Sequence, residues 1–232
     1  MRRLRGLRGS EGGFTLAEML AVMSILGVIT SLAFGALIQS QKTVRGNVNR
    51  LDQAQQAKAA VETMTKTIRT AVLPSQIGGG NTDLSAFLSA DWNRVSFYAN
   101  IYNPANVNGP SKVSYVLSSS GDLTESVQPP NGIDASGAYT YCIVGSPGCV
   151  VKTRIVARKI VYSSAKPLFV YYSVTQPAGM STPLTATTLP DVNSVDIALS
   201  VKSGNEVPAS TVITRVSLPN ANARINNNPA NT

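Results

Sequence analysis

The stretch Gly12-Gly13-Phe14-Thr15-Leu16-Ala17-Glu18 and the uncharged apolar run over residues 19–38 decide the fold of this 232-residue chain. An α-helix of about 20 residues spans a hydrocarbon core of about 30 Å. Four arginines precede the run, and this basic flank predicts a cytoplasmic N-terminus with the remainder of the chain extracytoplasmic. Glu18 lies at the edge of the run, where an unpaired carboxylate is costly and indicates a functional partner.

This arrangement resembles the class III signal of type IV pilins and pseudopilins: a short basic leader that ends in glycine, then Phe-Thr-Leu-x-Glu, then about twenty apolar residues. The resemblance implies that a prepilin peptidase cuts between Gly13 and Phe14 and that the new amino group of Phe14 is methylated. It also implies that Glu18 recognises the amino terminus of a neighbouring subunit during filament assembly. Such an amine would supply the partner that a desolvated carboxylate requires.

Two other interpretations of this region remain. An ordinary secretory signal also has a basic start and an apolar centre, and Ala33-Phe34-Gly35 has the small residues of its cleavage site. A plain uncleaved anchor in the inner membrane needs only the basic flank and the apolar run. The position of Glu18, and a helical pattern that continues beyond Gly35, favour the prepilin interpretation.

Behind the membrane segment of residues 14–38, an amphipathic continuation of the helix is predicted over residues 39–73, with Pro74 as its stop. Apolar or small residues recur there at steps of three and four, which trace one helical face. They are Val44, Val48, Leu51, Ala54, Ala57, Val61, Met64, Ile68 and Val72.

Residues 74–219 are predicted to form an extracytoplasmic β-rich domain, and residues 220–232, with six asparagines, a flexible tail. Strand patterns lie near residues 94–99, 112–118, 139–144, 150–157, 159–163 and 168–175, with a hairpin of 195–201 and 212–218. A long N-terminal helix before an antiparallel sheet is an α+β fold and is the lollipop plan of the pilin family. Patches at residues 60–71, 168–172 and 212–218 are similar to minor pilins of the W type and pseudopilins of the J type. That similarity implies a subunit that initiates or caps a type IV pilus or a type II secretion pseudopilus.

The two cysteines, Cys142 and Cys149, are predicted to form a disulfide, because thiols beyond the membrane meet an oxidising compartment. Residues 143–148 between them have the composition of a hairpin tip, which such a bridge would pin. Two buried free thiols are the alternative.

The chain has no histidine, which excludes Ser-His-Asp and Cys-His nucleophilic systems and the usual zinc ligand sets. No enzymatic activity, metal or cofactor is therefore expected, and an enzyme would have to rely on Ser, Asp, Glu or Lys chemistry without a recognisable motif. Asp122 and Glu125 could contribute to a calcium loop, but two carboxylates are too few. An ordinary turn followed by a solvated strand is the favoured interpretation of these two residues.

Net charge supports a second hypothesis, a DNA-binding or surface-binding subunit of a competence or adhesion pilus. The formal charge of +8 falls to +5 once the leader is removed, and a basic domain attracts phosphates. The basic residues are scattered apart from residues 152–154 and 158–159. An aromatic platform for stacking bases is a further possibility, although packing in strand faces is favoured for its members. They are Tyr139, Tyr141, Tyr162, Phe169, Tyr171 and Tyr172.

Overall fold

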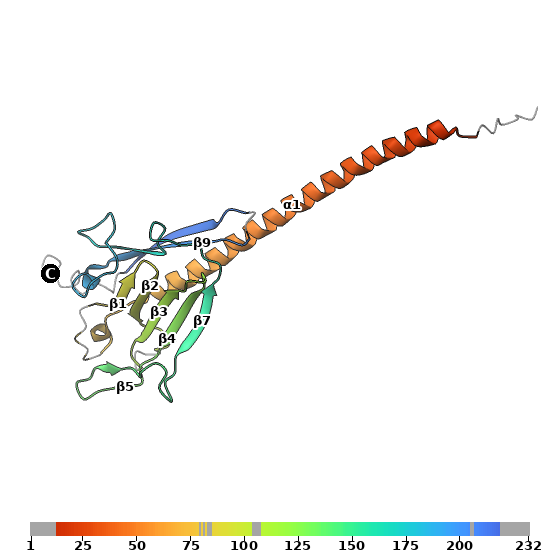
Figure 1. Ribbon diagram of the computed structural model, residues 1–232. Helices are drawn as coiled ribbons and strands as arrows, with labels where there is room; N and C mark the ends of the chain where they lie inside the picture. Colours follow the sequence, from red (N-terminus) through yellow and green to blue (C-terminus); the bar gives the residue numbers. More distant parts are fainter. Residues whose placement is uncertain are drawn as a thin grey trace, which may run out of the picture. The chain divides into compact units, whose positions relative to one another are not determined.

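The computed structural model of the protein describes residues 13–78, 80, 82, 85–103, 108–204 and 207–218. It divides into two compact units, Met1–Val48 and Asn49–Thr232. One long helix, α1 (Leu16–Ile68), begins in the first unit and ends in the second (Figure 1). Antiparallel sheets follow it, so the predicted α+β fold is confirmed. The predicted tail of residues 220–232 lies outside the described residues.

In the first unit, α1 carries the apolar run on an exposed helix. Every described residue up to Val48 is exposed except Gly46, which is intermediate. Two hydroxyls in the run are satisfied by the helix backbone: Ser24 donates to the carbonyl of Leu20 at 2.8 Å, and Thr30 donates to that of Leu26 at 2.7 Å. Residues 19–38 of the helix therefore present an uncharged and mainly apolar surface.

In the second unit, one face of α1 enters the core of the β domain. Its buried residues are Gln53, Ala57, Ala60, Val61, Met64 and Ile68. The predicted helical face is thus confirmed from Ala57 onward, because steps of three and four place these side chains on one side of the helix. The prediction is wrong for Leu51 and Ala54, which are exposed, since burial begins with the polar residue Gln53.

The helix ends at Ile68, five residues before the predicted end at residue 73. The chain leaves the helix because it pairs with the end of a strand: Asn100 N–H donates to the carbonyl of Thr70 at 2.8 Å, and Ala71 forms a β-bridge with Ala99. Pro74 does not stop α1 but begins the 3₁₀-helix η1 (Pro74–Ile77), where its missing N–H costs nothing.

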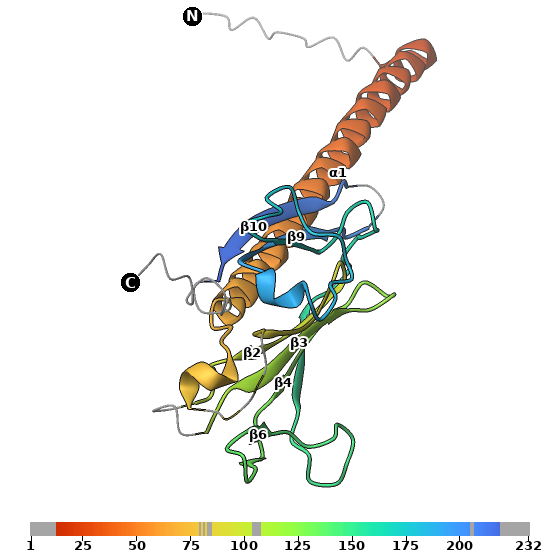
Figure 2. The same cartoon turned by 90° about the vertical axis from the view of Figure 1, so that its left-hand side faces the viewer.

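The larger sheet has five antiparallel strands in the order β1-β2-β3-β4-β7. They are β1 (Phe87–Asp91), β2 (Arg94–Ala99), β3 (Ser111–Leu117), β4 (Leu123–Gln128) and β7 (Lys152–Ala157). A two-stranded ribbon of β5 (Gly132–Ile133) and β6 (Tyr139–Thr140) extends from it. The second sheet, in the order β10-β9-β8, contains β8 (Phe169–Tyr172), β9 (Ser194–Val201) and β10 (Ser210–Ser217), and the short helix η3 (Leu189–Asp191) precedes β9 (Figures 1 and 2).

A single hydrophobic core joins α1 and both sheets of the second unit. Met64 of α1, Tyr115 of β3 and Ile197 of β9 belong to the same cluster, and all three are fully buried. The strict alternation of burial along β9 confirms the predicted hairpin of β9 and β10, whose eight residue pairs run without a bulge.

Three strand predictions need correction. The pattern over residues 139–144 yields only β6, because the chain turns at Ile143 into the loop between the cysteines. Residues 159–163 form no strand but two isolated bridges, of Ile160 with Val201 and of Ser163 with Lys166. The strand predicted to be solvated at Glu125 is β4, in which Glu125 is buried, and strand β1 was not predicted.

Candidate functional site

The predicted cut site lies immediately before α1. Gly13, Phe14 and Thr15 are non-helical, and the helix begins at Leu16. The Phe14 side chain is 79% exposed, and the carbon that a side chain at Gly13 would add meets no atom within 4 Å. The bond between these two residues is therefore in accessible, non-helical chain.

Glu18 lies in the first turn of α1, where its carboxylate faces the N-terminus of the helix. Glu18 Oε2 accepts hydrogen bonds of 3.3 Å from the backbone N–H and from the hydroxyl of Thr15. In return, Glu18 N–H donates to Thr15 Oγ1 at 3.3 Å. This reciprocal pair is a capping box, which satisfies N–H groups that the first turn of a helix leaves unpaired.

Sequence reasoning treated Glu18 as a carboxylate without a local partner and so missed the role of Thr15. The signal was present in the opening motif, since Thr15-x-x-Glu18 directly before an apolar run is the sequence pattern of a capping box. The single chain thus holds the Glu18 carboxylate in place before any neighbouring subunit is present.

The apolar part of α1 is long enough to cross a membrane. Among the described residues, α1 is the one helix that is long and apolar enough to cross a membrane. The mean hydropathy of its most apolar 18-residue window is 2.2. None of that window is buried in the protein. A fully exposed apolar helix requires lipid or other subunits around it.

Comparison with known protein families gives one finding for this region. Residues 8–34 match the model of the prokaryotic N-terminal methylation motif. A comparison of the sequence with curated proteins gives no match. The motif and the long apolar helix together fit a prepilin-type N-terminal signal. They support a member of the type IV pilin or pseudopilin family, a structural class whose subunits are processed by prepilin peptidase and assemble in membrane-associated filaments.

In the β domain, Cys142 and Cys149 form a disulfide with an S–S distance of 2.07 Å, and the structure has no free cysteine. The bridge closes a surface loop between β6 and β7, which are not paired with each other. The expected hairpin tip is therefore wrong, because β6 pairs with β5 and β7 pairs with β4. Two turns shape the loop, with Ser146 N–H bonded to Ile143 O and Cys149 N–H bonded to Ser146 O.

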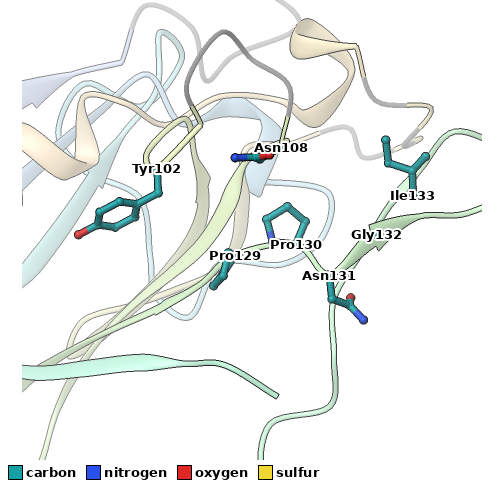
Figure 3. Close-up of a pocket in the computed structure, with 7 residues that line it drawn as sticks. All are labelled: Tyr102, Asn108, Pro129, Pro130, Asn131, Gly132 and Ile133. Carbon is teal, nitrogen blue, oxygen red and sulfur yellow. The ribbon is translucent and has the colours of Figure 1, made fainter. Parts of the chain in front are cut away.

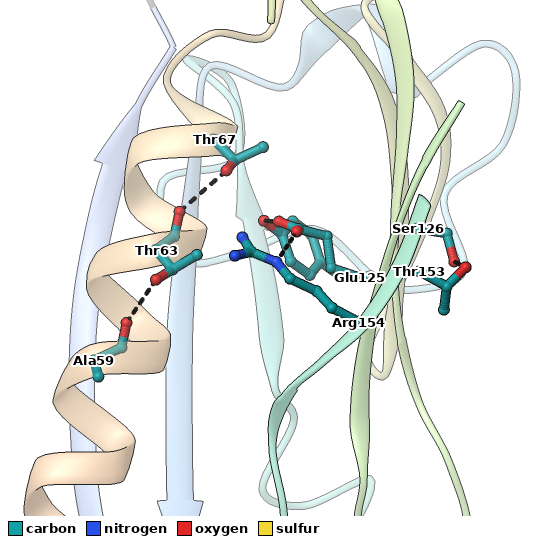
Figure 4. Close-up of polar contacts among 8 residues, drawn as sticks. Ala59, Thr63, Thr67, Glu125, Ser126, Thr153 and Arg154 are labelled. Carbon is teal, nitrogen blue, oxygen red and sulfur yellow. Dashed lines mark hydrogen bonds and ion pairs between the residues drawn. The ribbon is translucent and has the colours of Figure 1, made fainter. Parts of the chain in front are cut away.

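Glu125 is buried on the inner face of the larger sheet, which corrects its assignment to a solvated strand. It is 4% exposed, accepts a hydrogen bond of 2.5 Å from the Tyr115 hydroxyl and forms an ion pair with Arg154 (Figure 4). Burial raises the pKa of Tyr115 well above its usual value, and the hydrogen bond to Glu125 raises it further. The two carboxylates considered for a calcium loop thus have different partners. Glu125 pairs with Arg154, and Asp122 pairs with Arg158 at 3.6 Å.

No cluster of three or more His, Cys, Asp or Glu side chains that could hold a metal occurs among the residues that the structure describes. The predicted basic segments of residues 152–154 and 158–159 are also engaged in part. Arg154 and Arg158 have the carboxylate partners given above, and the Lys152 ammonium lies 4.8 Å from the centre of the Tyr102 ring. The basic residues of both segments are nevertheless exposed, so the segments keep a positive surface in the second unit.

The six aromatic residues considered as a platform are dispersed. Phe169 and Tyr171 are in the core, and the Tyr171 hydroxyl donates to the carbonyls of Asp91 and Arg94. Tyr172 lies beneath the Arg215 guanidinium, 4.0 Å from ring to cation, and donates to Asp196 at 2.8 Å. The predicted packing in the core is confirmed for Phe169 and Tyr171, whereas Tyr172 is half-buried.

A pocket of about 550 Å³ lies beside the connection from β4 to β5 and is lined by Tyr102, Asn108, Pro129, Pro130, Asn131, Gly132 and Ile133 (Figure 3). The lining residues that the structure describes supply amides, prolines and an aliphatic side chain, and the Tyr102 phenol is the only ionisable group among them. Figure 3 shows the Tyr102 ring directed away from the two prolines. This arrangement brings together no acid, base or nucleophile in hydrogen-bonding contact.

Proposed function

We propose that this protein is a minor pilin or pseudopilin that initiates or caps a type IV pilus or a type II secretion pseudopilus. The observation that carries the proposal is the methylation motif at residues 8–34, which includes the start of the exposed apolar part of α1. The resemblance of residues 60–71, 168–172 and 212–218 to minor subunits supports a role in initiating or capping the filament. It favours this role over that of the main subunit from which the filament is built. The basic leader supports insertion in the inner membrane with the N-terminus cytoplasmic and the β domain outside.

In this proposal, prepilin peptidase cuts the accessible bond between Gly13 and Phe14, and the Phe14 amine is methylated. The Glu18 carboxylate, held by Thr15 in the isolated chain, then pairs with the amine of a neighbouring subunit. The isolated chain holds this carboxylate only through the N–H and the hydroxyl of Thr15, whereas the assembled state adds a partner of full opposite charge, and this added pairing favours assembly. Glu18 thus acts as a registration contact between subunits.

Mass spectrometry of the mature protein tests the cut. We expect an N-terminal methylated Phe14 in cells that contain prepilin peptidase and full-length precursor in cells that lack it. A mature chain that starts at Ala36, or an uncleaved chain in both strains, would contradict the proposal.

Filament incorporation tests the contact. Glu18→Ala should leave the protein in the membrane but absent from sheared filaments, whereas Glu62→Ala, an exposed helical carboxylate in the second unit, should be incorporated normally. Immunogold labelling should place the wild-type protein at filament ends. Labelling along the whole filament would contradict the initiating or capping role.

A DNA-binding or surface-binding role for the β domain remains a separate candidate, supported by the charge of +5 after removal of the leader. A soluble fragment should begin near Asn49, because the helix residues Ala57, Met64 and Ile68 belong to the domain core. Retention of this fragment on immobilised DNA that weakens steeply with salt would support the role. No retention at low salt would exclude DNA.

A further inference from the structure

The outer face of the five-stranded sheet carries a groove that neither the filament proposal nor the motif explains. Its volume is about 370 Å³, within the range of small-molecule sites. The face is opposite the core: Figure 4 shows Ser126 and Thr153 on the far side of the sheet from Glu125, Arg154 and α1. The groove is thus accessible from solvent in the second unit.

Hydroxyl groups form the floor of the groove. Successive partners in register across β2, β3, β4 and β7 are Ser96, Ser114, Ser126 and Thr153. The four side chains therefore form one row across the sheet, since directly opposite residues lie on the same face. Solvent-facing strands more often carry long charged side chains, so a continuous row of short hydroxyls leaves the backbone surface open to a ligand.

The hydroxyls are joined in two pairs. Ser96 donates to Ser114 at 2.9 Å, and Ser126 and Thr153 are 3.3 Å apart with either as donor. Each pair uses one O–H hydrogen internally, so the second hydrogen and the remaining lone pairs can bond to a ligand. A ligand that itself carries several hydroxyls, each both donor and acceptor, matches this floor.

The loop closed by the disulfide supplies one wall. Val144 lines the groove although its side chain is 68% exposed, so its apolar surface is available to a ligand. Gln128 Nε2 donates to the carbonyl of Cys142 at 2.6 Å and fixes the loop to β4. The disulfide and this hydrogen bond hold the wall in place, which lowers the entropic cost of binding.

The positive charge of Lys112, which lines the groove, narrows the class of ligand further. The Lys112 ammonium lies 4.1 Å from the centre of the Tyr141 ring and 5.8 Å from that of Tyr98. Among the lining residues that the structure describes, Lys112 is the only one with a positive charge, and none carries a carboxylate. A polyanion such as DNA gains affinity from many phosphate contacts, so this groove suits a ligand with one negative charge beside neutral hydroxyls.

We propose that the groove binds an acidic glycan, with a sugar carboxylate beside Lys112, ring hydroxyls on the Ser and Thr row, and an apolar ring face against Val144. The site is separate from the cut and assembly residues. It would give the exposed domain a ligand of its own, whatever filament the protein enters.

Calorimetric titration of the full chain in detergent with cellobiouronic acid, a disaccharide that carries one carboxylate, tests the proposal, with neutral cellobiose as the comparison ligand. We expect cellobiouronate to bind and cellobiose to bind at least about fivefold more weakly, as for one lost charge-assisted hydrogen bond. Lys112→Met should remove this preference for the acidic ligand. Ser114→Val should weaken both ligands about fivefold.

Ser200→Val is the matched control, because Ser200 and Thr211 form the same kind of cross-strand hydroxyl pair, 2.8 Å apart, on the other sheet. It should bind as the wild type does. If circular dichroism shows that Ser114→Val is unfolded, Thr153→Val on the exposed edge strand replaces it. The proposal is overturned if no heat of binding is seen at millimolar cellobiouronate, if Ser200→Val weakens binding equally, or if a single-stranded DNA oligomer binds in its place and depends on Lys112.

Discussion

Tyr115 and Glu125 are direct partners across β3 and β4, and the phenol donates a hydrogen bond of 2.5 Å to the buried carboxylate. On the next strand, Arg154 is the register partner of Glu125 and pairs with its other oxygen. The carboxylate is thus held between two donors in one row of the sheet. A buried charge is tolerated where each of its oxygens has a partner of this kind.

Replacement of Glu125 by glutamine should lower the free energy of unfolding by about 1–3 kcal/mol. The amide keeps the shape of the side chain and can accept from Tyr115, but it cannot pair with Arg154 as a carboxylate does. Urea denaturation of the fragment from Asn49 measures the change. Asp122→Asn is the matched control, since its pair with Arg158 is 3.6 Å long and largely exposed, and its loss should cost less than about 0.5 kcal/mol. Equal losses in the two variants would refute the role given to Glu125.

The stability of the β domain should fall in alkaline solution. The folded-state pKa of Tyr115 is raised above the usual 10.0, mainly by burial, and burial likewise raises the pKa of Tyr171. Their contribution is complete below pH 10 and decreases as the pH rises further, because the unfolded phenols ionise while the folded ones stay protonated. Urea denaturation between pH 8 and pH 11, in steps of about one unit, measures the slope. Tyr115→Phe should flatten it, and a slope identical to that of the wild type would contradict the prediction.

Thr15→Val should loosen the start of α1 by about 1 kcal/mol, because valine cannot accept the hydrogen bond of a helix N-cap. Hydrogen exchange of the amides of residues 16–19 in detergent micelles should accelerate about fivefold. Glu18→Gln should retain protection, since glutamine also completes a capping box, while it removes the charge needed for assembly. Thr30→Val, whose hydroxyl only bonds back to Leu26 O within the helix, is the control. Unchanged exchange in Thr15→Val would exclude the cap.

Gln53→Leu should destabilise the second unit by about 1–3 kcal/mol. Gln53 is fully buried, and with its oxygen toward Ser203 it accepts from that N–H at 2.8 Å and donates to Ser210 Oγ and to Pro208 O. Leucine would leave these groups unpaired beneath the helix. Urea denaturation should show a lower midpoint, whereas Gln55→Leu, on the exposed side of α1, should stay within about 0.5 kcal/mol of the wild type.

Local patterns were sufficient to predict part of this fold. The 3.6-residue period placed Ala57, Met64 and Ile68 on the buried face of α1, and strict alternation predicted the β9–β10 hairpin. Local pattern failed where distant segments determine the outcome. The end of α1 depends on pairing with Ala99, and the burial of Glu125 depends on Arg154, 29 residues further along the chain.

In the candidate site, too, contiguous features were predicted from the sequence and features that depend on distant residues were not. The motif from Gly13 to Glu18 was visible in the sequence because its chemistry is contiguous, and its capping box has a spacing of three residues. The outer groove was not predicted, because its Ser and Thr residues are separated along the chain by 12 to 27 residues and meet only through strand register. No local sequence pattern shows that hydroxyl side chains from four different strands lie in one row across the sheet.

The disulfide between Cys142 and Cys149 also determines how proteolytic damage would be detected. The loop it closes is exposed, with the Ile143 side chain 81% accessible, so a protease can reach its backbone. A single cut within residues 143–148 would leave both fragments covalently joined and held by separate strands of one sheet. The nicked protein would migrate as an intact chain on a gel without reductant and as two pieces after reduction.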